Sequence, residues 1–510
     1  MAARLVERHG WDFVYWVGDG PAFGRLVESR FPGIIFHDTV DARLGRPPAA
    51  LADLVPRPFD EAMAEALSYE QALALKMMDR IELEESFRYH DRVRLFHRLT
   101  AWWSALLDHI KPDIMIIPTA PHVHYDYIAY ALCRRWGIRT AMFENGSIPG
   151  LLLPTPTFEE GFPGLVAAYA QLLVSSNGDD FPLSDRAQEY LDRTRGVYAF
   201  PRDVAQCDEV PTAREKTRGM TQRRLLSDLT KIVRVNRYPS YLRKIVRQIV
   251  RGDPPQTPAG RRIAGHYHGR FVVVGEATDA EEAQHSSWVS QRLADLRSEY
   301  DRLVTPAELS APYVYLPLHV QPERSTAPNG GIYDHCELML EAVARVVPPE
   351  WLILVKEHPS LFRSWQVGER GRRLFDYARM TALPNVRLVP LDTNPFDLID
   401  NARTVATVTG TSGWEAIARG VPVLCFGVAW YQGCDGVFDA RRLEGLCAGV
   451  EAILAGARPD ARKVRLFLKA VEVVGIQGYV DDDGRPDCKI GEGENIEALC
   501  EGLVAMARRS

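Results

Sequence analysis

Two stretches in the second half of the chain place polar side chains where they could hold a phosphate. In WLILVKEHPS (residues 351–360), a short apolar run with the length and β-branched content of a buried strand ends on polar residues that include Lys356 and His358. In TVATVTGTSGWEAIARG (residues 404–420), another apolar run leads through the turn GTSG (residues 410–413) into a helix. Such a turn offers free backbone N–H groups and hydroxyls at the positive end of a helix dipole. This half of the protein is therefore predicted to bind a phosphate.

A third strand tip carries further polar groups. The apolar run YVYLPL is followed by a polar segment that contains His319, Gln321, Glu323, Arg324, Ser325 and Thr326. Because parallel strands end at one edge of a sheet, these side chains and those above can converge on a single ligand. A nucleotide-activated sugar needs hydroxyls and N–H groups for phosphate oxygens, a cation or histidine for the leaving phosphate, and a carboxylate for the ribose diol. Taken singly, each residue could instead be a helix cap or a turn residue.

The elements that would position these residues alternate between strand and helix. From residue 311 onward, apolar runs are separated by amphipathic stretches, and this pattern predicts a doubly wound α/β domain. The predicted strands are residues 313–318, 351–356, 386–390, 404–408 and 421–427.

The first part of the chain shows the same alternation. We expect an α/β layer with a parallel sheet, together with one or two long amphipathic helices between Tyr69 and Ile110. The predicted strands are residues 11–20, 33–38, 113–119 and 138–144, and the predicted shorter helices are residues 21–30 and 124–137.

Two polar groups fall at the carboxyl ends of neighbouring predicted strands in this layer. PHVHYD (residues 121–126) contributes His122 and Asp126, and FENGS (residues 143–147) contributes Glu144. A carboxylate and a histidine in this setting could act as a nucleophile or general base with its orienting partner. The alternative is that Asp126 and His122 simply cap the following helix. Residue type and location leave both interpretations open.

Composition sets broad limits on the class of protein. A chain of 510 residues exceeds what one hydrophobic core usually supports, so two or three domains are expected. The eight cysteines contain no CxxC pair, so neither a zinc site nor a disulfide framework is indicated, and a reducing, cytoplasmic setting is expected. The N-terminus lacks the apolar core of a signal peptide, and no later segment approaches the ~18 uncharged residues of a membrane span.

Residues 212–252 differ in kind from the rest of the chain. They hold twelve basic and two acidic residues, with apolar residues interleaved at helical spacing, so they form a basic amphipathic element with a net charge of +10. Three interpretations compete: contact with an anionic membrane surface, binding of a polyanion or nucleic acid, and a solvated helix whose apolar side is core. No nucleic-acid recognition motif accompanies the charge, so nucleic acid is not expected as a partner.

The residues around the three strand tips of the second half resemble a known family. The runs PLHVQPERST, VKEHPS and VTGTSGWEAIARGVPVLCFG are similar to the capsule polysaccharide synthesis family, which includes transferases that use CMP-activated Kdo, a 2-keto sugar acid. The resemblance covers residues 311–435 and, through PHVHYD and FENGSIPG, residues 121–150. It implies a GT-B-like glycosyltransferase, in which two Rossmann-like domains face a cleft, with the donor nucleotide in the C-terminal domain and the acceptor on the N-terminal one.

The resemblance also implies roles for single residues. His358 would contact the nucleotide phosphate and assist its departure, the hydroxyls of the GTSG turn would bind phosphate oxygens, and Glu415 would bind the ribose. Gln321 and Glu323 are similar to a Gln-x-x-Asp-like motif of the Kdo enzymes, with a different spacing and acid. The implied nucleotide-binding set is Gln321, Glu323, Lys356, His358, Pro359, Thr411, Ser412, Gly413 and Glu415.

The catalytic carboxylate would come from the N-terminal half. Asp126 and Glu144 are the candidates, and His122 and His358 complete the candidate catalytic set. A retaining enzyme would use the carboxylate as a nucleophile, whereas an inverting enzyme would use it to deprotonate the acceptor hydroxyl. No DxD-like metal site stands out, and a leaving group with a single phosphate has less need of Mg²⁺, so we expect a metal-independent reaction whose only small-molecule requirement is the nucleotide-sugar donor.

These considerations predict an organisation and a function for the whole chain. We expect an N-terminal α/β acceptor and catalytic domain (1–175), a linker with the basic helical insertion (176–305), a nucleotide-sugar domain (306–480) and a C-terminal helix that packs back on the N-terminal domain (481–510). The expected function is transfer of a sugar such as Kdo or a related nonulosonic acid from a CMP-activated donor to a glycan, glycolipid or protein acceptor in bacterial surface polysaccharide biosynthesis. The protein would be cytoplasmic, with the basic element offering peripheral contact with the inner face of the membrane. The rivals are a sugar-nucleotide epimerase of similar build and a non-catalytic polyanion- or membrane-binding protein.

Overall fold

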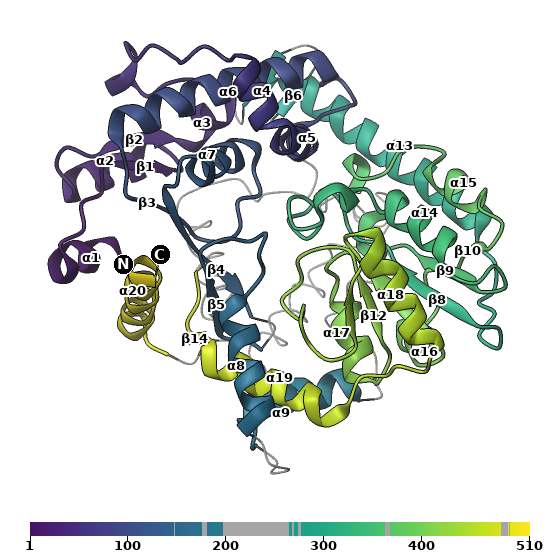
Figure 1. Cartoon of the computed structure of the whole chain (residues 1–510). Coiled ribbons are helices and arrows are strands. Elements are labelled where there is room, and N and C mark those ends of the chain that lie inside the picture. Colours follow the sequence, from purple (N-terminus) through teal and green to yellow (C-terminus); the bar gives the residue numbers. More distant parts are fainter. Residues whose placement is uncertain are drawn as a thin grey trace, which may run out of the picture.

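The structure is a computed structural model of the chain, and it describes residues 1–146, 148–175, 181–196, 265–267, 270–273, 277–362, 368–480, 488 and 490–509. The basic element of residues 212–252 lies outside the described residues. Two α/β units make up the described chain, an N-terminal unit drawn mostly in purple and blue and a C-terminal unit drawn mostly in green (Figure 1).

The C-terminal unit is built on one sheet of six parallel strands in the order β10-β9-β8-β11-β12-β13. Counted along the chain, this is the order 3-2-1-4-5-6 of a doubly wound fold, which reverses between β8 and β11. The strands are β8 (Tyr313–Pro317), β9 (Leu352–Lys356), β10 (Val386–Leu388), β11 (Thr404–Thr407), β12 (Val423–Cys425) and β13 (Val437–Asp439). The five predicted strands are confirmed, and β13 is an additional edge strand.

Both faces of this sheet are buried beneath helices. Along β8, Tyr313 and Tyr315 join one apolar core while Val314 and Leu316 join the other, as the two-residue period of a strand requires. One core is completed by α8 (Pro163–Ser175), α9 (Asp185–Arg195), α16 (Pro395–Asp400), α17 (Thr411–Ala418) and α19 (Ala461–Val474). The other is completed by α13 (Asp279–Leu303), α14 (Cys336–Val346), α15 (Asp376–Thr381) and α18 (Leu443–Leu454).

The N-terminal unit contains two parallel or mixed sheets in addition to a small antiparallel pair described below. The strands β1 (Tyr15–Gly18) and β2 (Ile35–Asp38) form a parallel pair, and a second sheet has the order β14-β5-β4-β3. In that sheet β3 (Ile114–Ile117) and β4 (Arg139–Asn145) are parallel, as predicted, but β5 (Leu151–Thr155) and β14 (Ile476–Gln477) run antiparallel to their neighbours. The expected purely parallel layer is therefore corrected to a mixed one, because the short connection after β4 folds the chain straight back as a hairpin.

Helices cover the N-terminal sheets and create the wall that faces the C-terminal unit. The two predicted long helices are α5 (Ser68–Met77) and α6 (Tyr89–Ile110), joined through the 3₁₀ turn η2 (Met78–Ile81). The shorter helices are α1 (Ala2–His9), α2 (Pro21–Arg30), α3 (Thr39–Leu44), α4 (Glu61–Ala66) and α7 (His124–Arg135). A 3₁₀ turn η1 (Ala49–Leu51) and a small antiparallel pair, β6 (Gly265–Tyr267) and β7 (Arg270–Val272), complete this region.

The last helix, α20 (Glu492–Arg509), lies beside α1, so both ends of the chain meet at the N-terminal unit (Figure 1). Leu499 and Leu503 of α20 are buried in one apolar cluster with Leu5 of α1 and Phe143 of β4. The strand β14 and the helix α20 thus return to the N-terminal unit after the C-terminal unit is complete.

Candidate functional site

The point where the strand order reverses, between β8 and β11, is where ligands bind in open α/β sheets. His319 follows β8 and is buried, and its Nε2 lies 3.1 Å from Thr407 Oγ1 at the end of β11. The backbone N–H of Val408 donates to the same Nε2 at 3.3 Å. Burial lowers the pKa of His319 to about 3, so the ring is neutral and its Nε2 acts as an acceptor. His319 therefore ties the two strand tips together.

The GTSG turn leads from β11 into α17 in the expected way. The Gly410 N–H donates to Thr407 Oγ1 at 3.1 Å, and the Tyr431 hydroxyl donates to Gly410 O at 2.7 Å. Gly413 is required here, because a Cβ at this position would lie 2.2 Å from the Tyr431 hydroxyl. The helix starts at Thr411, whose side chain is exposed. The arrangement can present N–H groups and hydroxyls to an anion.

Glu415 lies on α17, two residues beyond the GTSG turn. Burial raises the pKa of its carboxyl to about 7, and the nearby Arg419 opposes that rise only in part. Tyr315 of β8 and Tyr431 are close enough for their own pKa values to be raised by Glu415 as well as by burial. The carboxyl is thus largely surrounded by protein on the α17 side of the sheet.

The tip of β9 carries the predicted His-Pro pair. Lys356 is buried, and its backbone carbonyl accepts from Leu318 N at 2.8 Å. His358 is exposed, and its Nδ1 accepts from Ser360 N at 3.2 Å. A neutral ring with Nδ1 as acceptor carries its proton on Nε2, which can then serve as a donor. Pro359 begins the 3₁₀ turn η5 (Pro359–Phe362).

Gln321 is engaged inside the protein. Its Oε1 accepts from Arg372 Nη1, and its Nε2 donates to the backbone carbonyl of Asp334. Arg372 is itself fully buried in an ion pair with Glu357, with 2.8 Å between Nε and Oε2, and it donates to His319 O at 3.1 Å. Arg372 and Gln321 therefore hold the segments after β8 and β9 in place. Gln321 thus positions these segments, and its predicted contact with a nucleotide would be made in addition to these bonds.

The loop after β8, residues 321–330, contacts both units. Arg324 Nη1 forms an ion pair of 2.6 Å with Glu144 Oε2 and also donates to Thr119 Oγ1. Glu144 is buried at the end of β4, where it accepts from Ala120 N at 2.8 Å. On the other side of the loop, Thr409 Oγ1 donates to Ser325 O at 2.7 Å.

Arg80 of η2 adds a second connection to this loop. Its Nη2 donates to Ala327 O at 2.8 Å, and it interacts electrostatically with Asp126 and with Glu323, which is exposed on the same loop. Burial lowers the pKa of Arg80 to about 10. The predicted carboxylates of the N-terminal unit and the predicted phosphate site are thus joined through one loop.

Asp126 caps the start of α7, which is one of the two roles considered for it. Its Oδ1 accepts from Val123 N at 2.9 Å at the start of α7. Burial nevertheless raises the pKa of this carboxyl to about 7, although hydrogen bonds and Arg80 oppose the rise. A carboxyl that titrates near neutrality is suited to accept a proton in catalysis, so capping and catalysis are compatible.

His122, which precedes α7, and His124, the first residue of α7, have their own partners. His122 Nδ1 lies 3.0 Å from Ala120 O, and burial lowers the pKa of its imidazole. His124 is buried with Nε2 2.9 Å from Arg43 O, and burial lowers its pKa to about 4. His122 therefore bonds to Ala120, whose N–H binds the candidate carboxylate Glu144, whereas His124 is a structural residue.

Sequence reasoning missed Arg80 and Arg372, which connect the predicted residues. Arg80 lies next to Asp79 within the otherwise apolar run around Met77 and Ile81, and a charged pair inside such a run is a signal that could have marked it. Arg372 lies in a segment rich in charged residues, where no pattern separates a buried arginine from an exposed one.

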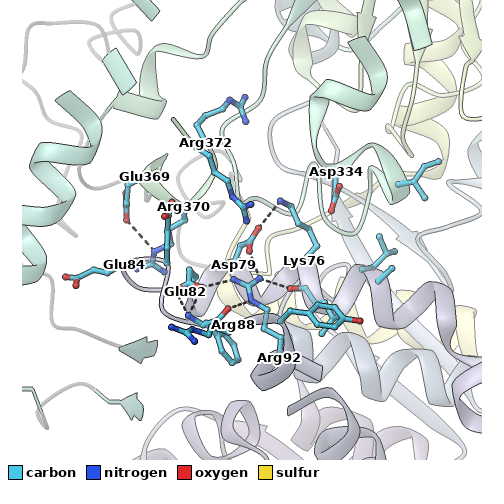
Figure 2. Close-up of a pocket in the computed structure, with 18 of the residues that line it drawn as sticks. Lys76, Asp79, Glu82, Glu84, Arg88, Arg92, Asp334, Glu369, Arg370 and Arg372 are labelled. Atoms are coloured by element: carbon cyan, nitrogen blue, oxygen red, sulfur yellow. Dashed lines mark hydrogen bonds and ion pairs between the residues drawn. The ribbon is translucent and has the colours of Figure 1, made fainter. Parts of the chain in front are cut away.

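A cavity of about 760 Å³ lies beside Asp79 and Arg372, between the two units (Figure 2). One wall comes from α5, η2 and the start of α6, and the other from the 3₁₀ turns η4 (Gly331–Asp334) and η7 (Gly368–Arg370) with the residues that follow η7. None of the predicted catalytic or nucleotide-binding residues lines it.

The described residues contain neither a candidate metal site nor a helix that could span a membrane. In that part of the chain no group of three or more His, Cys, Asp and Glu side chains is arranged to hold a metal ion. Nor does any described helix have the length and apolar character needed to cross a membrane.

The solved structures to which the chain is similar include a transferase and an epimerase. The chain is similar to Thermosulfurimonas dismutans KpsC, beta Kdo 2,4 transferase, with 14% identity, coverage of 69% of this chain and 78% of the other, and a TM-score of 0.27. It is also similar to UDP-GlcNAc 2-epimerase from Methanocaldococcus jannaschii, with 12% identity, coverage of 91% and 100%, and a TM-score of 0.24.

Relatives in sequence are similar over limited segments. Protein FixF of Sinorhizobium fredii is 28% identical over 172 residues, which are 33% of this chain and 39% of FixF. Capsule polysaccharide modification protein LipA of Neisseria meningitidis serogroup B is 35% identical over 96 residues, 19% of this chain and 12% of LipA. The matches thus span well under half the length of these relatives.

The family resemblance deduced from the three strand tips is confirmed by a family model. The model described as capsule polysaccharide biosynthesis protein matches residues 291–447, which extend from within α13 into α18 and include all six strands of the C-terminal sheet. The similarity to this family therefore includes the His-Pro tip of β9 and the GTSG turn.

Proposed function

We propose that the protein is a glycosyltransferase of GT-B type that moves a sugar from a CMP-activated donor to a glycan, glycolipid or protein acceptor in bacterial surface polysaccharide biosynthesis. The donor sugar in this proposal is a 2-keto sugar acid, such as Kdo or a related nonulosonic acid. The observation that carries it is the loop of residues 321–330, which is bonded to the GTSG side of the switch point through Thr409 and to the carboxylates of the N-terminal unit through Arg324 and Arg80. A donor at the switch point would therefore face those carboxylates.

The donor phosphate would bind at the start of α17. N–H groups at the start of the helix and the hydroxyls of Thr411 and Ser412 would donate to its oxygens, and the helix dipole favours the negative charge. His358 would donate from Nε2 to the phosphate as it leaves. Glu415 would accept from the ribose hydroxyls. Because CMP leaves with one phosphate that these groups can hold, the proposed reaction needs no bound metal.

The acceptor hydroxyl would be activated by Asp126. Its pKa of about 7 allows it to be ionised before the reaction and protonated after it. The hydroxyl oxygen would attack the anomeric carbon, its proton would pass to Asp126, and the electrons of the broken glycosidic bond would leave with CMP. Glu144, held by Arg324 and by Ala120 N, would orient the site.

The proposal is tested by nucleotide binding and then by transfer. CMP should raise the melting temperature of the protein more than UMP or UDP does, because ligand that binds only the folded state stabilises it. Asp126→Asn should retain that shift and lose transfer of a CMP-activated sugar acid. Absence of any nucleotide shift would contradict the proposal, and isomerisation of a sugar nucleotide without transfer would favour an epimerase.

Peripheral membrane contact through residues 212–252 remains a separate prediction. Changing four basic residues of that element to Glu should abolish sedimentation with anionic liposomes. Unaltered sedimentation would contradict membrane contact through this element. The four are Arg243, Lys244, Arg247 and Arg251.

A further inference from the structure

We propose that the cavity between α5, η2 and α6 on one side and η4 and η7 on the other binds an acidic stretch of glycan, as part of the acceptor. The acceptor assignment rests on the proposed function, whereas the preference for acidic sugars rests on the cavity itself. At about 760 Å³, the cavity has room for a few sugar units of an oligosaccharide.

The cavity is close to the candidate catalytic carboxylate Asp126. Asp79 lines it, and the next residue, Arg80, interacts with Asp126. On the opposite wall Asp334 lines it, and the backbone carbonyl of Asp334 accepts from Gln321, in the segment that follows β8. A glycan whose end is activated at Asp126 could therefore continue into the cavity.

Most of the charges on the first wall already have partners. Lys76 Nζ lies 2.9 Å from Asp79 Oδ2, and Arg92 pairs with Asp79 at 2.5 Å and with Glu82 at 2.8 Å (Figure 2). These pairs neutralise one another inside the cavity wall. They build its shape and contribute little net charge to a ligand.

Two cations differ from these paired groups. Arg88 on one wall and Arg373 on the other are both exposed, and neither side chain has an ion pair or a hydrogen bond with any residue that the structure describes. Guanidinium groups bind carboxylate and phosphate oxygens in a planar, two-pronged geometry. Two such groups facing one cavity from opposite walls favour a ligand with repeated negative charges.

Exposed rings at the same cavity supply surfaces for sugar rings. Tyr69 is 50% exposed and Tyr89 is 64% exposed, although large aromatic side chains are usually buried. Their flat apolar faces and polar edges suit amphipathic ligands such as sugars. Tyr69 also touches the far wall, because a Cβ on Gly331 would lie 2.6 Å from its hydroxyl. The lining therefore combines stacking surfaces with unpaired cations.

Calorimetric binding of defined oligosaccharides tests this inference on the full chain. A hexamer of galacturonic acid, with a carboxylate on every sugar, should bind at least about tenfold more tightly than maltohexaose, and added salt should weaken it. Replacing both exposed cations with the double variant Arg88→Gln/Arg373→Gln should weaken the acidic hexamer by about tenfold or more. Tyr69→Ala should weaken both sugars. The control is Arg135→Gln/Arg403→Gln, which removes two exposed arginines outside the cavity and should bind as the unaltered protein does.

The outcomes separate this inference from the proposed function. If CMP raises the melting temperature but the acidic hexamer binds no better than the neutral one, the inference is overturned while the transferase proposal stands. If the hexamer binds through Arg88 and Arg373 but no nucleotide binds, the cavity is an acidic-glycan site and the transferase proposal fails. Equal losses in the control variant, or competition between CMP and the hexamer, would also overturn the inference.

Discussion

Arg324 of the C-terminal unit and Glu144 of the N-terminal unit form an ion pair across the interface, with 2.6 Å between Nη1 and Oε2. The arginine side chain is 30% exposed and the glutamate side chain is 10% exposed, so the pair is only partly shielded from solvent. It joins the loop that follows the first strand of the C-terminal sheet to the end of β4. The pair therefore links the positions of the two units at the candidate site.

The first prediction concerns the strength of this link. Arg324→Gln should lower the free energy of unfolding by about 1–3 kcal/mol, because it leaves a largely buried carboxylate without its cation. Urea denaturation measures the change. Arg134→Gln is the control, since Arg134 pairs with Glu160 at 3.2 Å where both side chains are exposed, and such pairs contribute less than about 1 kcal/mol. A double-mutant cycle with Glu144→Gln that shows simple additivity would contradict a direct interaction.

The second prediction concerns the histidine at the tip of β9. His358→Ala should lower the turnover number for transfer by at least about 100-fold, because the leaving phosphate would lose a positioned proton donor. Steady-state rates with saturating CMP-activated donor measure this effect. His9→Ala, at the exposed end of α1, is the control and should leave the rate unchanged. A near-normal rate for His358→Ala would remove this residue from the site.

The third prediction concerns the close contact beneath the GTSG turn. Gly413→Ala should disturb the turn, because its Cβ would meet the Tyr431 hydroxyl at 2.2 Å and Thr407 Cγ2 at 3.0 Å. We expect a loss of about 1–3 kcal/mol in stability and a smaller CMP-induced shift in melting temperature. Adding Tyr431→Phe removes the closest atom and should restore part of both quantities. If Gly413→Ala melts and responds to CMP as the unaltered protein does, the turn is not as tightly packed as described.

The fourth prediction is a pH dependence that arises from Glu415. Its folded-state pKa of about 7 is higher than its ordinary value of 4.5, so the folded protein binds more protons between these values. Stability should therefore fall as pH rises from about 4.5 to about 7 and then level off, with a total change of about 3 kcal/mol. Urea denaturation of Glu415→Gln at pH 5, 6, 7 and 8 should show a decline smaller by this amount, because Asp126 still contributes a decline of its own.

The control for that experiment is Glu451→Gln, at an exposed position of α18. It should follow the pH profile of the unaltered protein. Parallel pH profiles for the unaltered protein and for Glu415→Gln would contradict the assigned environment of Glu415.

Much of the fold could be predicted because the local signals agree with the final packing. The helix α2 was predicted at residues 21–30 and is found at Pro21–Arg30, where Gly20 precedes a proline in the first turn. The buried strands of the C-terminal sheet were recognisable from continuous apolar runs, since helices cover both faces. The edge strand β13 has only three residues, and none is buried, so it carries no such run.

The site was only partly predictable, because sequence indicates which residues end a strand but not which side chains meet. The polar tips of β8, β9 and β11 could be located, and the family model described as capsule polysaccharide biosynthesis protein matches the segment that contains them. The contacts that connect them depend on Arg80 and Arg372, which lie far along the chain from their partners. The exposed cations of the cavity could not be inferred either, because exposure and missing partners are properties of the folded chain.

The return of β14 and α20 to the N-terminal unit has a consequence for dissecting the molecule. A fragment that stops at residue 175 would lack Leu499 and Leu503, and it would leave Leu5 and Phe143 uncovered. Such a truncated piece should aggregate when produced by itself, whereas supplying residues 460–510 as a second polypeptide should rescue its solubility.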